Sequence, residues 1–123
     1  MKIDEAVIAF KLNKTYKPTM TPMQLYDATR HSWKVGERRN SAEYAFAVFQ
    51  GEVKEVYKIA IWLPQNSTLN TKDKENIEDK TINTDRWEFV GTIAPEKIRY
   101  KYIGKDISDF FKSKQNPVAY INC

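Results

Sequence analysis

A chain of 123 residues, 41% hydrophobic and 29% charged, has the length and composition of one globular domain. Its net charge of +4 is mildly basic, which suits a polyanionic partner but does not require one. The single cysteine, Cys123, excludes a disulfide within the chain, and no apolar run is long enough to span a membrane. The short N-terminal apolar stretch carries Asp4 and Glu5 and is not typical of a signal peptide, so we expect a cytoplasmic protein with no membrane partner.

The N-terminal third predicts a strand followed by a capped helix. Apolar residues alternate through 3–12, a pattern typical of a strand with one buried face. Thr21, Pro22 and Gln24 then match a capping box with proline at the first helical position. We therefore expect a helix from Pro22 to about His31.

The middle of the chain predicts a hairpin. The segment 44–49 is apolar on both faces, which favours a central strand covered on both sides or a strand of a small barrel. Gln50-Gly51 predicts the turn into a second, longer strand. Its alternation predicts one apolar face made of Val53, Tyr57, Ile59 and Ile61. Lys58 and Trp62 are expected on the opposite face.

Residues 64–85 predict a polar, mobile excursion from the domain. Five acidic residues and three lysines give this segment a charge of −2, and because the whole chain carries +4, the remainder carries +6. Large apolar side chains are rare within it, as is typical of an exposed connection.

The C-terminal third predicts one strand, two short helical segments and a final strand. The segment 86–93 alternates again. Pro95 is expected to begin a short helix that Gly104 ends, and Asp106 to cap a further helical turn. The last strand is expected over 117–121.

The expected order is strand, helix, strand, strand, excursion, strand, helix, helix, strand. It contains no repeated βαβ unit, so a doubly wound parallel sheet is not expected. We predict an α+β fold in a single domain over residues 1–123. Its centre would be a small curved mixed sheet, or a partly open β-barrel, with helices packed at its ends.

The segment 30–40 interleaves aromatic and basic residues, a pattern typical of sites that hold phosphates and stack a flat ring. We expect a contiguous positive surface formed by Arg30, Lys34, Arg38 and Arg39. Trp33 lies between Arg30 and Lys34, and we expect its indole to border a pocket. The alternative is a solvated basic loop whose tryptophan packs into the core.

The sequence lacks the motifs of several other kinds of site. One histidine and one cysteine cannot form a zinc site, and no glycine-rich phosphate loop is present. His31 lies in a basic stretch, where neighbouring cations would lower its pKa, so we expect no catalytic triad through it. We therefore expect no catalytic residues, no metal and no cofactor.

The helix leading into Thr29-Arg30-His31-Ser32-Trp33, the basic turn and the strand pair 44–57 together resemble the PUA-like superfamily, especially its EVE and YTH branches. The resemblance covers roughly residues 20–62, and Gly51-Glu52-Val53-Lys54-Glu55-Val56 stands where those branches have a glycine–valine strand. It implies a domain that flips a modified base into an aromatic cage while basic residues hold the flanking phosphates. Trp33 and Trp62 would be the first candidates for that cage and Trp87 the third.

Two asparagines are candidates for a polar contact to the base. Asn40 ends the basic stretch. Asn116 precedes Pro117, and a turn into the last strand explains that pair better than a base contact does.

The leading functional hypothesis is a nucleic-acid-binding domain for DNA or RNA, without enzymatic activity, that reads a modified base. One alternative is a small-molecule or nucleotide-binding domain, or a small enzyme, that uses the same pocket. A second alternative is a protein-interaction module. Aromatic walls with an open basic rim would favour the reader, whereas a closed pocket with a buried carboxylate would favour an enzyme.

Overall fold

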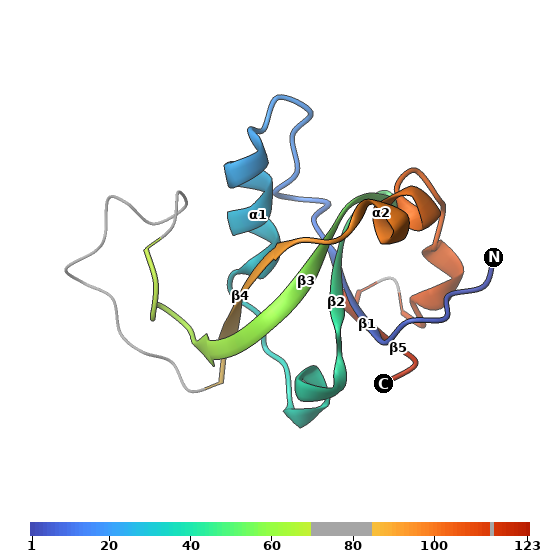
Figure 1. Cartoon of the computed structure of the whole chain (residues 1–123). Helices are drawn as coiled ribbons and strands as arrows, with labels where there is room; N and C mark the ends of the chain where they lie inside the picture. The colour runs from blue at the N-terminus through green and yellow to red at the C-terminus, as the bar shows by residue number, and fades with distance from the viewer. Residues whose placement is uncertain (70–84, 114) are drawn as a thin grey trace.

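A computed structural model describes residues 1–69, 85–113 and 115–123 of the chain. The elements, in chain order, are β1 (Val7–Lys11), α1 (Pro22–Arg30), the 3-10 turn η1 (Glu37–Ser41), β2 (Tyr44–Phe49), β3 (Glu52–Pro64), β4 (Trp87–Ile93), α2 (Glu96–Tyr102), the 3-10 turn η3 (Ser108–Phe110) and β5 (Val118–Ile121). This order agrees with the one predicted from the sequence. Figure 1 shows the elements arranged around one sheet.

The five strands form one mixed sheet in the order β4-β3-β2-β1-β5. β1 and β2 are parallel, and the other neighbouring pairs are antiparallel. The predicted α+β class and mixed sheet are therefore confirmed. Among the described residues the sheet is open, with β4 and β5 at its two edges, and it is not closed into a barrel.

Two hydrophobic cores lie on the two faces of the sheet. One packs Phe46, Val48 and Val56 against Tyr102 of α2 and the η3 region. The other packs Phe10 and Phe89 beneath α1 and the tryptophans. α2 therefore packs on one face of the sheet and α1 on the other.

Local sequence signals were reliable where they act over a few residues. The Thr21 hydroxyl accepts from the Gln24 amide at 3.1 Å, and the Gln24 side chain accepts from the Thr21 amide at 2.9 Å, which completes the capping box. Gln50 and Gly51 both have positive φ, 50° and 82°, as a tight hairpin turn requires. Gly104, with φ 85°, follows α2 as predicted.

The faces of β3 differ from the prediction because the strand is irregular in two places. The register with β2 shifts between Ala47 and Val48, and the register with β4 shifts between Ile59 and Ile61. Each extra residue moves the following side chains to the other face of the sheet. The single apolar face is consequently split between the two cores, and Trp62 packs on the α1 side with Tyr57. Most of the excursion expected over 64–85 lies outside the described residues.

Gly91 of β4 provides a test of the close approach between β4 and β3. A Cβ on Gly91 would lie 2.2 Å from the carbonyl oxygen of Lys58, and this backbone cannot move without disturbing the sheet. We expect Gly91→Ala to lower the free energy of unfolding by about 3 kcal/mol, the upper end of the range for overpacking. Gly36→Ala is the matched control, because nothing lies within 4 Å of its added Cβ. Equal urea-unfolding midpoints for the two variants would contradict this packing.

Candidate functional site

The three tryptophans of the chain come together on the α1 face of the sheet. Trp33, just after α1, exchanges two backbone hydrogen bonds with Trp87 at the start of β4, at 2.9 and 2.8 Å. Trp62 lies on β3 opposite Phe89 of β4. All three are partly exposed and pack against the same core. We call Trp33, Trp62 and Trp87 the tryptophan platform.

The core phenylalanines support two of these rings. Trp33 stacks on Phe10 with ring centroids 4.5 Å apart and an angle of 17° between the planes. Trp62 meets Phe89 edge-on, with centroids 5.3 Å apart. The Trp33 indole nitrogen donates to the Thr29 carbonyl oxygen at 2.7 Å, and that of Trp62 donates to the Arg39 carbonyl oxygen at 3.1 Å. These contacts fix both indoles while part of each stays open to solvent.

A pocket of about 370 Å³ lies beside Trp33 at the end of β1. We call it the Trp33 pocket; its lining residues are Lys11, Asn13, Lys14, Thr15, Trp33, Gln115 and Pro117. None of these residues is acidic. Lys14 is exposed, whereas the Lys11 ammonium donates to the Ser113 carbonyl oxygen at 3.1 Å. Trp33 therefore borders a pocket that two lysines also line.

Arg30 is buried, so its expected place on a basic surface is corrected. It is only 4% exposed, because Glu88 and Asp27 attract it into the protein interior. Its Nε donates to the Asp27 carboxylate at 2.9 Å, and its Nη1 lies 3.4 Å from the Glu88 carboxylate. The other Nη donates to the Leu69 carbonyl oxygen at 3.0 Å. Arg30 thus ties α1 to β4 and to the start of the β3–β4 connection, and it is not available to a phosphate.

The other predicted cations lie nearer the surface. Lys34 and Arg38 are exposed, and Arg39 is half-buried. The Arg38 guanidinium lies 4.3 Å from the Tyr120 ring centroid, and that of Arg39 lies 3.6 Å from the Trp87 ring centroid. The basic segment therefore reaches across the sheet from β4 to β5, with two of its arginines held on aromatic rings.

The two candidate asparagines are both exposed. Asn40 lies in η1, close in sequence to the two arginines. The Asn116 side-chain oxygen accepts from the Val118 amide at 3.0 Å, so this residue forms the turn that enters β5.

The only histidine has a different environment from the one expected. His31 is 5% exposed, and its Nε2 lies 3.3 Å from the Glu88 carboxylate, so an acid and not a cation is its close charged neighbour. Glu88 is fully buried and accepts from the Asn66 amide at 2.8 Å and from the Thr68 hydroxyl. It does not line the Trp33 pocket. Glu88 therefore joins β4 to His31 and to the start of the β3–β4 connection.

Sequence reasoning missed the role of Glu88. Its neighbours Trp87 and Phe89 alternate as a strand should, and an acid between them is usually solvated. One related signal was present in the sequence. Asp27 and Arg30 are spaced so that they can form an ion pair on one turn of α1.

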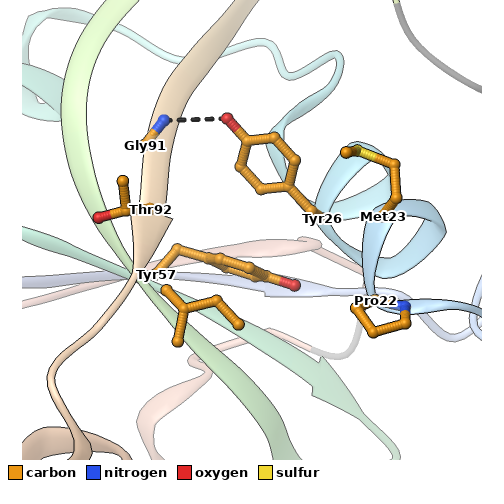
Figure 2. A pocket seen from close by; sticks show the side chains of 7 residues that line it. Pro22, Met23, Tyr26, Tyr57, Gly91 and Thr92 are labelled. Atoms are coloured by element: carbon orange, nitrogen blue, oxygen red, sulfur yellow. Dashed lines mark hydrogen bonds between the residues drawn. The ribbon is translucent and has the colours of Figure 1, made fainter.

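A second pocket, of about 230 Å³, lies between the first turn of α1 and β4 (Figure 2). It is apolar, and its lining residues are Pro22, Met23, Tyr26, Tyr57, Gly91, Thr92 and Ile93. The Tyr26 hydroxyl oxygen accepts from the Gly91 amide at 3.0 Å, the dashed line in Figure 2. Burial raises the pKa of the Tyr57 hydroxyl, so that group stays neutral. With no charged lining residue, this pocket does not suit a polyanion.

The Tyr26–Gly91 contact predicts a measurable effect on stability. Tyr26→Phe removes the acceptor and leaves the Gly91 amide, on the outer edge of β4, without its partner. We expect the free energy of unfolding to fall by about 1 kcal/mol. Tyr100→Phe is the control, because that tyrosine is 77% exposed. If both variants unfold at the same urea concentration, the hydroxyl contributes nothing to the edge of the sheet.

Comparison with models of known families, with curated proteins and with solved structures gave no match. Across the part of the chain that the structure describes, no group of three or more histidine, cysteine, aspartate or glutamate residues could hold a metal ion. Within the same residues, no helix combines the length and apolar character needed to cross a membrane.

Proposed function

We propose that the chain is a nucleic-acid-binding domain that holds an unpaired base at Trp33. The observation that carries this proposal is the Trp33 pocket, which combines an indole wall, two lysines and no acidic lining residue. Stacking a base on an aromatic ring is worth about 1–3 kcal/mol, and lysines beside the ring can neutralise the attached phosphates. Among the described lining residues there is no histidine, cysteine or carboxylate, the groups that most often act as general base or nucleophile.

The proposed ligand is a single strand or a flipped nucleotide. A base within a duplex presents only its edges, so its flat face reaches a tryptophan only after leaving the stack. Lys11, Lys14 and Lys34 would then contact the flanking phosphates. Arg39 lies over Trp87, which favours Trp87 as a support for the platform, with Trp33 as the stacking residue.

The resemblance to the EVE and YTH branches adds a finer proposal, that the bound base is modified. Such branches select an altered base with an aromatic cage, and of the three candidate tryptophans Trp33 lines the pocket. The matching experiment compares oligonucleotides that differ only in one methylated base. If all the oligonucleotides bind with equal affinity, the proposal that a base stacks on Trp33 stands, and the proposal that the base is modified is contradicted.

Removing one cation that lines the Trp33 pocket, Lys14, together with the exposed cation that follows Trp33 in the sequence, Lys34, tests the binding face. We expect Lys14→Ala with Lys34→Ala to weaken single-strand binding. The slope of log affinity against log salt should fall by about 0.7 for each phosphate that a lysine no longer neutralises. Lys97→Ala with Lys105→Ala is the control, because it removes the same charge from exposed positions at and after α2. Fluorescence anisotropy over a salt series measures both quantities.

If the two double variants lose affinity and slope equally, binding depends on net charge alone. That result would contradict a face at Trp33.

A further inference from the structure

A third cavity, of about 120 Å³, lies beside β5 and is lined mostly by polar atoms. Its lining residues are Arg38, Phe110, Lys112, Asn116, Val118, Ala119 and Tyr120. Two of them are cations and none is acidic. The turn that carries Asn116 continues directly into the residues of the Trp33 pocket, because Gln115 and Pro117 line that pocket. The two cavities therefore lie on either side of one short turn.

Contacts at Nε, at Nη2 and with an aromatic ring fix the Arg38 guanidinium, and its Nη1 makes no described hydrogen bond. Its Nε and Nη2 donate to the Cys123 carbonyl oxygen at 3.2 and 2.5 Å, while its plane lies over the Tyr120 ring. Among the described residues, none accepts a hydrogen bond from its Nη1. An arginine oriented in this way loses little side-chain entropy when it binds an anion.

Asn116 supplies a second oriented donor. Because its side-chain oxygen accepts from the Val118 amide, the other end of the amide group must be the NH2 group. No described residue accepts a hydrogen bond from that NH2 group. Lys112 is exposed and forms no ion pair with any described residue, so its ammonium is a third available donor.

We propose that this cavity binds one phosphate group of the nucleic-acid strand whose base occupies the Trp33 pocket. The inference rests on the proposed function and names the place where the neighbouring phosphate is held. A phosphate has acceptor oxygens pointing in several directions, which matches donors from Arg38, Lys112 and Asn116 better than a planar carboxylate does. At about 30 Å³ for each water molecule in the liquid, the cavity displaces a few waters, a volume suited to one small anion.

The test uses the complete chain and inorganic phosphate as the probe. We expect a phosphate titration to shift the NMR signals of the Arg38 Nε–H and the Asn116 side-chain NH2, and acetate at equal concentration to shift them much less. Asn116→Asp is the decisive variant, because it keeps the oxygen that accepts from Val118 and replaces the donor with an acceptor. We expect it to weaken phosphate binding at least about tenfold, since a hydrogen bond to a charged group is removed and an anion is added. Asn40→Asp is the control, because the same substitution adds the same charge at an exposed position of η1.

Binding of a single-stranded oligonucleotide to the same variants separates this inference from the proposed function. A parallel loss of phosphate and oligonucleotide affinity in Asn116→Asp supports both. Phosphate binding without any oligonucleotide binding keeps the anion site and overturns the function. No phosphate shift, an equal response to acetate, or unchanged oligonucleotide affinity in Asn116→Asp would each overturn the phosphate site.

Discussion

Replacing Arg30 with alanine is expected to lower the free energy of unfolding by about 3–5 kcal/mol, the usual result of breaking a buried ion pair. Asp27 and Glu88 are 2% and 0% exposed, so both carboxylates would remain in the interior without the guanidinium. The Leu69 carbonyl oxygen would also lose its donor. Urea unfolding at neutral pH measures the change.

Two further variants separate the effect of the hydrogen-bond geometry of Arg30 from the effect of its charge. Arg30→Lys keeps the charge but cannot reach Asp27, Glu88 and Leu69 together, so we expect an intermediate loss. Lys34→Ala, four residues along the chain, removes an exposed cation and should change stability by no more than about 0.5 kcal/mol. If Arg30→Ala unfolded at the same urea concentration as Lys34→Ala, the buried network would not stabilise the fold.

Replacing Trp33 with alanine is expected to reduce both stability and binding. The ring stacks on Phe10 and its nitrogen is bonded to Thr29, so we expect the free energy of unfolding to fall by about 2–3 kcal/mol, less than for a fully enclosed tryptophan. Single-strand affinity should fall by about 1–3 kcal/mol, or roughly 5- to 150-fold.

A matched pair of variants separates the two effects of Trp33. Trp33→Phe keeps an aromatic ring on Phe10, and we expect it to restore most of the stability and part of the affinity. Both variants are compared at a temperature where each is folded, as judged by circular dichroism. Reduced stability with unchanged affinity in Trp33→Ala would identify Trp33 as a core residue only.

The elements that the sequence predicted well depend on signals only a few residues apart. The capping box at Thr21 and the turn at Gln50-Gly51 specify their own conformations, whatever surrounds them. The faces of β3 could not be predicted in the same way. Its two register shifts depend on how β2 and β4 pair with it, and no local pattern reports such pairing.

In the candidate site, too, the features set by neighbouring residues could be predicted, and those set by distant residues could not. The density of cations in 30–40 did indicate exposed basic residues, since Lys34 and Arg38 are exposed. The fate of Arg30, however, depended on Glu88, 58 residues away in the sequence, which binds it in the interior. Asn116 was correctly recognised as a turn residue, but its unused amide group is visible only once its partner Val118 is known.

The central claim, that a base stacks on Trp33, can be tested on the indole N–H signals of the three tryptophans. Single-residue variants assign these signals in a proton–nitrogen NMR spectrum, and a short single-stranded oligonucleotide is then titrated into the full chain. We predict that the Trp33 signal shifts most, together with backbone amides of Lys14 and Gln115 in the same pocket. Binding that leaves the Trp33 signal in place, while residues of the apolar pocket or of α2 shift instead, would contradict the claim.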